Sequence, residues 1–480
     1  MQKLFPKFAA RYWAVLLVAL LAVGLASFRA DAQALYGTIV GEVTDPQGAA
    51  LPGVTVTITN TGTGLKLDAV TDDTGTYVFR NLPPGNYDMT LSLKGFKETR
   101  QSAIVVSAGN PKREDVTLQV GGAQESVTVT ADAATLKTEK ADLSTELTSV
   151  QVTSLPLNQY RNYQTLLNLV PGATPVQFQN AEIDTPGRSL RTWVNGVQPN
   201  SNTTRVDGAV SVNVWLPHHA GYIQPVETIE TVNIATNNFD ADIGMAGGAA
   251  QTVVTKSGTN QFRGSGFWFF NGDKLNANSF FNNANALART PLSRNTYGGT
   301  IGGPIKKDKL FFFASYENFR DRRTGNFTYA VPTDKMRLGD FSEVAAAYNT
   351  PANPNRFQIY DPATGGAAGA GRDQFANFIV PSARISPIAR GVMNFYPKVN
   401  SARDLNNNFL LDDFVQQRQV QVDRGNYDGK LTWQRSKEHS IWGKFSTLRA
   451  NVVDNFSLGF DEGSLGDTKV YVVSVGHTWT

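Results

Sequence analysis

The stretch GGAAQTVVTKSGTNQFRGSGFWFF, residues 247–270, decides how the chain divides. Its first half is a small-residue turn followed by a polar strand that ends in Lys256, Ser257 and Gly258. Its second half closes on four consecutive aromatic residues, Phe267–Phe270. A water-soluble domain rarely places so many large apolar side chains directly after a polar turn. The two halves are therefore expected to meet different surroundings, and the change is expected near Thr259 and Asn260.

Composition narrows the classes of function. The chain has 480 residues, long enough for several domains, and its net charge of only +3 argues against a large nucleic-acid-binding surface. It contains no cysteine, which excludes disulfides, thiolate metal sites and a cysteine nucleophile. With 43 glycines and only 18% charged residues, it favours short strands and turns over a helical bundle.

Residues 1–34 have the pattern of a secretory signal peptide. Lys3, Lys7 and Arg11 precede an apolar run over 13–25, and small residues flank two candidate cleavage points within 30–34. The alternative is a membrane anchor, but a spanning helix needs about 20 apolar residues. No later stretch is long and apolar enough for such a helix, so entry into a membrane would require a β-barrel.

Residues 35–120 are expected to form a small antiparallel β-sandwich, because short alternating strands are separated by regularly spaced turns. The pattern V-x-D-x-x-G over 43–48, followed by G-x-Y-x-F-x-x-L-P-P-G-x-Y over 75–87, resembles the carboxypeptidase regulatory-like domain, a transthyretin-like sandwich. The chain has four histidines and no H-E-x-x-H, so zinc peptidase chemistry is not expected. His218 and His219 are adjacent and would point to opposite faces of a strand, so no metal site is predicted.

Residues 121–139 are predicted to be a linker that contains one short alternating strand, Ser126–Thr130. Its place between two domains makes it a candidate extended peptide that could add to the edge of another protein's sheet.

Residues 140–258 mix helical spacing with short strands. Two helices are predicted, and Leu166, Leu167, Leu169 and Val170 are expected on one side of the second, which Pro171 and Gly172 should end. Small residues at 244 and 246–248 allow close approach of backbones. The alternative is a generic α/β domain with glycine-rich turns.

Residues 259–480 differ in composition from the segments before them. Between Phe262 and Tyr329 there are 15 aromatic residues in 68, about twice the density of the whole chain. Two hairpins are predicted, with charged turns at 306–309 and 435–438 and strands of about ten residues, the length that crosses a bilayer. A long irregular region over about 325–420 separates them. The alternative is a large soluble sandwich, whose sheets could also bury aromatic rings on both faces.

Several segments together resemble the N-terminal part of TonB-dependent outer-membrane transporters, in the Oar-like group that carries a carboxypeptidase regulatory-like domain. ESVTVTA (125–131) resembles a TonB box, LPLNQYRNYQTLLNLVPG (155–172) an early plug helix, and TRVDGA (204–209) a plug strand. Residues 226–267 resemble the end of the plug and the first barrel strand, and residues 298–320 resemble the next hairpin.

This resemblance implies a mostly β fold with four parts after the signal peptide. They are the sandwich (35–120), the TonB box and linker (121–139), an α+β plug (140–258) and the first strands of an outer-membrane β-barrel (259–480). Residues 253–480 hold six to eight predicted strands, whereas the plugged barrels of the family have about 22. We therefore expect the chain to be the N-terminal portion of a longer protein.

The resemblance also implies roles for residues. The TonB-binding strand would be Glu125, Ser126, Val127, Thr128, Val129, Thr130 and Ala131. Polar contacts of the plug with the barrel are expected from Arg191, Asp207, Glu227, Glu230 and Lys256, and the plug motif adds Gly208, Gly247, Gly248, Thr255, Ser257 and Gly258. A simpler interpretation of the charged residues is that some are only surface charges.

The implied function is energised import rather than enzyme catalysis, with no cofactor. The expected partners are TonB with its inner-membrane proton-driven complex, outer-membrane lipid and an unidentified extracellular substrate, but no nucleic acid. Two alternatives stay open: an outer-membrane structural or adhesion barrel without transport, and a soluble exported carbohydrate-binding protein built from sandwiches.

Overall fold

The computed structural model describes most of the chain after its N-terminus. The described residues are 36–121, 126–130, 139–178, 182, 185–213, 219–239, 243–244, 246–284, 287–366, 368–400, 414–454 and 464–479. The predicted signal peptide, Glu125, Ala131 and His218 lie outside them. No helix among these residues is long and apolar enough to span a bilayer.

The first part is a two-sheet β-sandwich, as predicted. One sheet has the order β4-β1-β7, with β8 also on β1, and the other has the order β3-β2-β5-β6-β9. The strands are β1 (Gly37–Thr44), β2 (Thr55–Asn60), β3 (Lys66–Val70), β4 (Thr76–Leu82), β5 (Gly85–Ser92), β6 (Glu98–Val106), β7 (Pro111–Arg113), β8 (Val116–Thr117) and β9 (Ser126–Thr130).

Alternating side chains of both sheets fill the core of the sandwich. Ile39 and Val43 of β1 meet Val56 and Ile58 of β2, all fully buried. Tyr77 is buried with them, and its hydroxyl donates to the carbonyl oxygen of Glu114 at 2.6 Å, which ties the end of the domain to β4. Burial raises the pKa of Tyr77 well above its usual value. A buried phenol with a partner keeps the core both packed and satisfied.

The second part, which corresponds to the predicted plug, is a mixed sheet covered by short helices. The sheet has the order β10-β15-β16-β13-β14, and a separate pair joins β11 to β12. The elements are β10 (Leu143–Thr148), α2 (Ser149–Ser154), η1 (Tyr163–Leu169), β11 (Gln177–Phe178), β12 (Leu190–Arg191), η2 (Pro199–Ser201), β13 (Thr203–Val206), β14 (Ala209–Val210), η3 (Val226–Thr228), β15 (Ile229–Asn237) and β16 (Ala250–Thr255).

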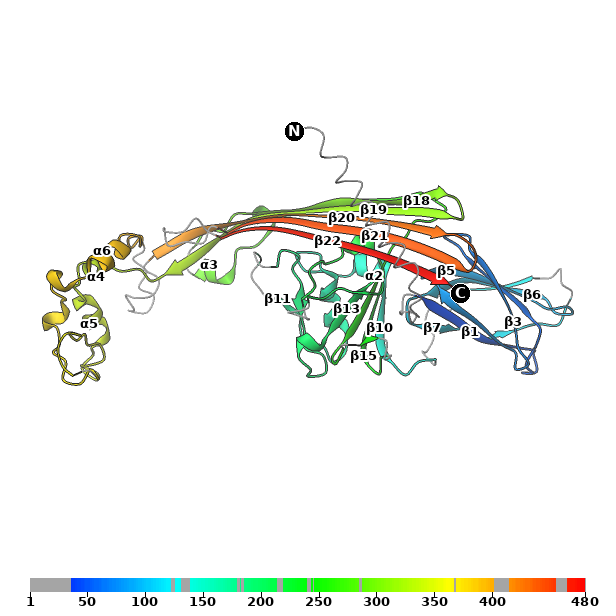
Figure 1. Cartoon of the computed structure of the whole chain (residues 1–480), viewed down its shortest axis with the longest axis horizontal. Coiled ribbons are helices and arrows are strands. Elements are labelled where there is room, and N and C mark those ends of the chain that lie inside the picture. Colours follow the sequence, from blue (N-terminus) through cyan, green and yellow to red (C-terminus); the bar gives the residue numbers. More distant parts are fainter. Residues whose placement is uncertain are drawn as a thin grey trace, which may run out of the picture.

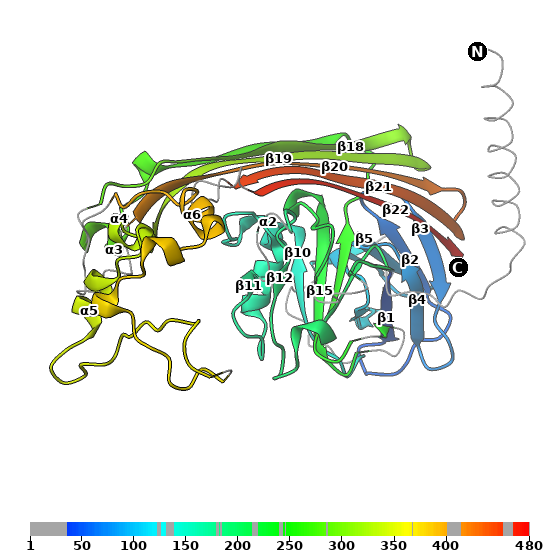
Figure 2. The same cartoon turned by 60° about the vertical axis from the view of Figure 1, so that its left-hand side comes forward.

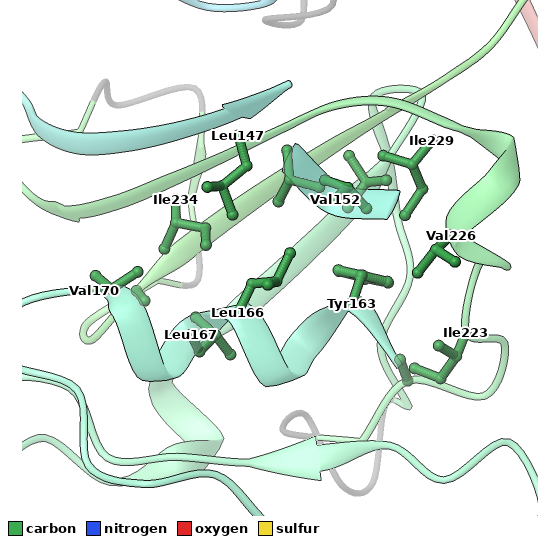
Figure 3. Close-up of a cluster of buried hydrophobic side chains, with 14 of the residues drawn as sticks. Leu147, Val152, Tyr163, Leu166, Leu167, Val170, Ile223, Val226, Ile229 and Ile234 are labelled. Carbon is green, nitrogen blue, oxygen red and sulfur yellow. The ribbon is translucent and has the colours of Figure 1, made fainter. Parts of the chain in front are cut away.

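One buried cluster joins the helices of this part to its sheet. Leu166, Leu167 and Val170 lie in one cluster with Leu147 and Ile234 of the sheet, as Figure 3 shows. The predicted helix over this segment is a 3₁₀-helix, η1, and it ends before Pro171 as expected. The expectation for Leu169 was wrong: its side chain is 55% exposed. Leu169 is the last residue of η1, and it lies outside the buried cluster that holds Leu166, Leu167 and Val170.

The third part is a six-stranded antiparallel sheet of neighbouring strands in chain order, open at both edges. Its strands are β17 (Arg263–Gly272), β18 (Leu292–Lys306), β19 (Leu310–Tyr329), β20 (Phe414–Gln434), β21 (His439–Asp454) and β22 (Ser464–Trp479). Both predicted hairpins are present, with turns at 307–309 and 435–438. The expected strand length of about ten residues is wrong for β18–β22, because each continues past the span that a bilayer requires.

The two faces of this sheet differ in chemistry. On the face turned away from the plug, Trp268 of β17 is 70% exposed and Val473 of β22 is 72% exposed. Phe445 of β21 is paired with Val473 on this face, and Tyr471 lies two residues before Val473 on β22. On the face turned toward the plug, buried charged residues such as Arg424, Asp428 and Lys430 alternate with these apolar positions. A sheet that is apolar outside and polar inside is the pattern of an outer-membrane barrel wall.

A long connection joins β19 to β20 at one end of the sheet. It is more ordered than the irregular region predicted over 325–420, since β19 runs on to Tyr329 and β20 starts at Phe414. Short helices occupy this connection and the one after β17: η5 (Asp273–Leu275), α3 (Phe280–Ala284), α4 (Asp334–Arg337), α5 (Ser342–Tyr348), η6 (Ala376–Phe378), η7 (Ser382–Arg384) and α6 (Pro387–Met393).

The long sheet arches over the other two parts (Figure 1). The plug lies against the middle of its concave face, and the sandwich lies at the end where the short turns are. The helices α4, α5 and α6 lie at the opposite end (Figure 2). Short turns at one end and long loops at the other is the asymmetry expected of these barrels.

Candidate functional site

The interface between the plug and the sheet is polar and buried, and Asp207 is at its centre. Asp207 follows β13 in a turn, with φ of +47°, and Gly208 continues the turn with φ of +80°. Thr255 at the end of β16 donates to the Asp207 carboxylate from its backbone nitrogen at 2.9 Å and from its hydroxyl at 2.5 Å. The turn and these two bonds fix the carboxylate so that it faces the sheet.

Two lysines of the sheet meet that carboxylate. Lys430 of β20 lies 3.2 Å from Oδ1 of Asp207, and Lys444 of β21 lies 3.2 Å from Oδ2. Burial by itself raises the pKa of Asp207, but Lys430, Lys444 and the Thr255 hydrogen bonds outweigh it and lower the pKa to about 2. Asp207 therefore stays ionised and bridges the plug to two adjacent strands.

A second ionic cluster lies further along β20. Arg161, in the loop before η1, pairs with Glu227 at 2.9 Å and approaches Glu317 of β19 at 3.5 Å. Arg424 of β20 lies 3.6 Å from the same Glu317. The Arg161 guanidinium also lies over the ring of Phe269, 4.3 Å from its centre, which is a cation–π contact with the first strand of the sheet.

Two further contacts tie the plug to the sheet. Tyr222 donates its hydroxyl to Asp428 at 2.9 Å, and Ser446 donates to the same carboxylate at 2.6 Å. Glu182 pairs with Arg323 of β19 and accepts from the Tyr160 hydroxyl at 2.8 Å. Burial raises the pKa of Glu182, but the Arg323 guanidinium outweighs it and holds that pKa below its usual value.

Gly258 marks where the chain passes from the plug to the sheet. A Cβ at this position would lie 2.3 Å from the carbonyl oxygen of Phe312 and 2.7 Å from that of Gly303, both backbone atoms of β18 and β19. Only glycine fits so close to two strands. The neighbouring Ser257 lies 3.4 Å from the hydroxyl of Thr432 on β20.

The other predicted plug residues lie apart from the Asp207 cluster or at its margin. Glu230 is half-buried, and burial raises its pKa although Lys256 and Lys430 oppose this. The Lys256 backbone nitrogen donates to Thr228. Arg191 lies over the ring of Trp193 within the plug. Gly247 and Gly248 donate from their backbones to Ser201, and a Cβ on Gly248 would lie 2.4 Å from Asn202.

The partners on the sheet were missed from the sequence. Lys430, Lys444, Glu317 and Asp428 were not predicted, although a signal was present. In the run NYDGKLTWQ, Asp428 and Lys430 alternate with Tyr427 and Leu431, which is the pattern of a strand with one polar and one apolar face. Charged residues on the polar face of such a strand are candidates for contacts inside a barrel.

The candidate TonB-box strand, β9, is placed on the sandwich. It pairs in parallel with β6, with Glu98 opposite Ser126 and Ser102 opposite Thr130, and so forms the edge of the five-stranded sheet.

The sandwich itself touches both other parts. Asn260 donates to Thr63 at 2.9 Å and to Asp308 in the β18–β19 turn at 2.6 Å.

Two family matches and one curated relative bear on this arrangement. Residues 254–480 match the outer membrane beta barrel domain, and residues 38–119 match the carboxypeptidase regulatory-like domain. The TonB-dependent transporter Oar of Myxococcus xanthus is 28% identical over 337 residues. That alignment covers 67% of this chain and 30% of Oar, so the chain spans less than a third of the length of this relative.

Three solved outer-membrane receptor or transporter structures are among those similar to this chain. The siderophore receptor PirA from Acinetobacter baumannii has 15% identity and a TM-score of 0.34, with 65% of this chain and 32% of that chain covered. The ferric enterobactin receptor PfeA from Pseudomonas aeruginosa has 13% identity and a TM-score of 0.36, with 70% of this chain and 38% of that chain covered. The outer membrane transporter YddB from Escherichia coli has 12% identity and a TM-score of 0.37, with 65% of this chain and 33% of that chain covered.

Proposed function

We propose that this chain acts in the outer membrane in TonB-energised import of an extracellular substrate. The proposal is supported by its matches to the outer membrane beta barrel domain and the carboxypeptidase regulatory-like domain and by its similarity to the TonB-dependent transporter Oar. Its relatives are transporters and receptors, and we propose that it is likewise not an enzyme. The outer-membrane match removes the soluble carbohydrate-binding alternative.

The observation that carries the proposal is the chemistry of the plug–sheet interface. The plug meets the sheet through Asp207 with its two lysines, Tyr222 with Asp428, and Arg161 with Glu317. A plug that must move needs contacts that water can replace when they separate, and ions and hydrogen bonds meet that need better than an apolar core. We propose that these contacts hold the plug closed at rest.

The proposed cycle follows from the order of the parts along the chain. Substrate binds at the end of the sheet that carries α4, α5 and α6, which we assign to the extracellular side. TonB binds residues 125–131 at the sandwich end by strand addition, where main-chain hydrogen bonds supply the affinity. β10 of the plug starts at Leu143, 12 positions after the end of this segment at 131, so a pull on the segment reaches the plug, and force then separates the polar contacts.

Deleting residues 125–131 tests this proposal. We expect the deletion variant to reach the outer membrane in normal amounts but to lose capture by the purified periplasmic domain of TonB. As a control of equal length, deletion within the exposed loop segment 351–357 should leave capture intact. Normal capture without residues 125–131 would overturn the proposal and favour the alternative of a structural or adhesion barrel.

A further inference from the structure

The edge of β6 is a strand-binding surface, and the chain itself fills it. β9 adds to β6 over five paired positions, from Glu98 with Ser126 to Ser102 with Thr130. One hydrogen-bonding edge of the candidate TonB-binding segment is therefore already used inside the sandwich. β9 is the outermost described strand of this sheet, so its other edge has no partner among the described strands. TonB competes with β6 when it adds to the edge of β9 that now faces β6.

Contacts on both sides of β9 hold it to the sandwich. Gly121, five residues before β9, donates its backbone nitrogen to the carbonyl oxygen of Gly95 at 3.2 Å. Glu139, nine residues after β9, pairs with Arg113 of β7 at 2.9 Å. Seventeen residues, 122–138, separate these two anchors, so β9 stays tethered to the sandwich at both ends while both contacts hold.

The sandwich is in turn held against the barrel end and the plug. Lys437 in the β20–β21 turn lies 3.3 Å from Asp68 of β3. The side-chain amide of Asn260 donates both to the carbonyl oxygen of Thr63 in the sandwich and to the carboxylate of Asp308 in the β18–β19 turn. Glu146 of plug strand β10 accepts from Asn110 at 2.9 Å and also bonds to Ser107. Ser107 directly follows β6, so the plug touches the chain at the end of the strand that holds β9.

We propose that the sandwich withholds the TonB-binding strand, and that β6 and TonB compete for residues 126–130. The inference rests on the proposed function, because it assumes that TonB binds this segment. Parallel pairing at a sheet edge is weaker than antiparallel pairing in a sheet interior, which makes β9 suited to exchange. The Glu146 contact places the plug where its movement disturbs the end of β6.

A reversible disulfide tests this competition, because the chain has no cysteine of its own. Arg100 and Thr128 occupy paired positions on β6 and β9, so the double variant Arg100→Cys/Thr128→Cys can lock the strand in place. The control lock is Thr55→Cys/Val70→Cys, a paired and exposed position on β2 and β3 at the other edge of the same sheet. Each protein is purified in detergent and titrated with the periplasmic domain of TonB, oxidised and then reduced.

We expect oxidation of the β6–β9 pair to form the crosslink and to weaken TonB binding at least tenfold, and reduction to restore it. The control lock should leave binding within about twofold of the unmodified protein. Equal binding by the oxidised and reduced forms would overturn the inference and leave the proposed function standing. Failure of the crosslink to form would overturn it as well. Absence of TonB binding by the reduced and unmodified proteins alike would overturn the proposed function itself.

Discussion

Lys430 and Lys444 occupy directly opposite positions on β20 and β21, and both are buried. Like charges at paired positions of a sheet destabilise it. The Asp207 carboxylate of the plug lies within 3.2 Å of both ammonium groups and supplies the opposing charge. Without the plug, the two buried lysines of the sheet would face each other with no carboxylate from Asp207 to balance their charge. The stability of the sheet therefore depends on the position of the plug.

The first prediction concerns the loss of that charge. Asp207→Asn leaves two buried ammonium groups facing each other, and we expect it to lower the free energy of plug unfolding by about 3 kcal/mol. Native-state proteolysis of the plug at increasing urea concentrations measures this. Asp467→Asn is the matched control, since Asp467 pairs with Lys469 at 3.5 Å on an exposed stretch of β22. An equal effect of both substitutions would contradict the role given to Asp207.

The second prediction is that part of this loss can be recovered. Adding Lys444→Met to the Asp207→Asn variant removes one unpaired buried charge and keeps the volume of the side chain. The double variant should be more stable than Asp207→Asn alone, by about 1–2 kcal/mol in the same assay. Additive losses from the two substitutions would show that the charges do not interact.

The third prediction is a pH dependence. The folded-state pKa of Asp207 is about 2, below the value of about 3.9 expected in the unfolded chain. The unfolded state therefore binds more protons between these values, and Asp207 contributes about 2–3 kcal/mol that is fully present above pH 4 and is lost as the pH falls toward 2. The stability gap between the natural protein and Asp207→Asn should narrow over this range. A gap that stays constant from pH 7 to pH 2.5 would contradict the assigned ion pairs.

The fourth prediction concerns the outer face of the sheet. Phe445 lies on the apolar face of β21, and we expect Phe445→Arg to cost about 2–4 kcal/mol if this face meets lipid. The folded fraction in isolated outer membranes, read from heat-modifiable migration in SDS gels, should fall. Leu338→Arg is the control, because Leu338 is exposed in the long connection outside the sheet. Equal folding of the two variants would mean that the Phe445 face is not in lipid.

Much of this architecture follows from the sequence for identifiable reasons. The sandwich strands and both hairpins were predicted because turn residues and alternating apolar positions repeat at short range, as around Lys306 and Arg435. Leu169 was placed wrongly because an apolar residue in the sequence does not by itself show whether the rest of the fold covers it.

The candidate site was less predictable, because its partners are far apart in the chain. Asp207 was identified from its motif, but Lys430 lies 223 residues later, and only the folded sheet brings the two together. The pairing of β9 with β6 was also missed, because it is a contact between separate strands that only the folded chain shows. A short alternating strand can add to any free edge, and its sequence does not say whether that edge belongs to TonB or to its own domain.

We propose that residues 125–131 bind TonB, and site-directed crosslinking in living cells detects this contact. Val127→Cys places one cysteine in β9, and Val70→Cys places one at the opposite edge of the same sheet as a control. Each is expressed with a set of single-cysteine variants of the periplasmic domain of TonB. We predict a disulfide between TonB and the cysteine at position 127, and none at position 70. No crosslink from position 127 in cells where both proteins are present would contradict the claim.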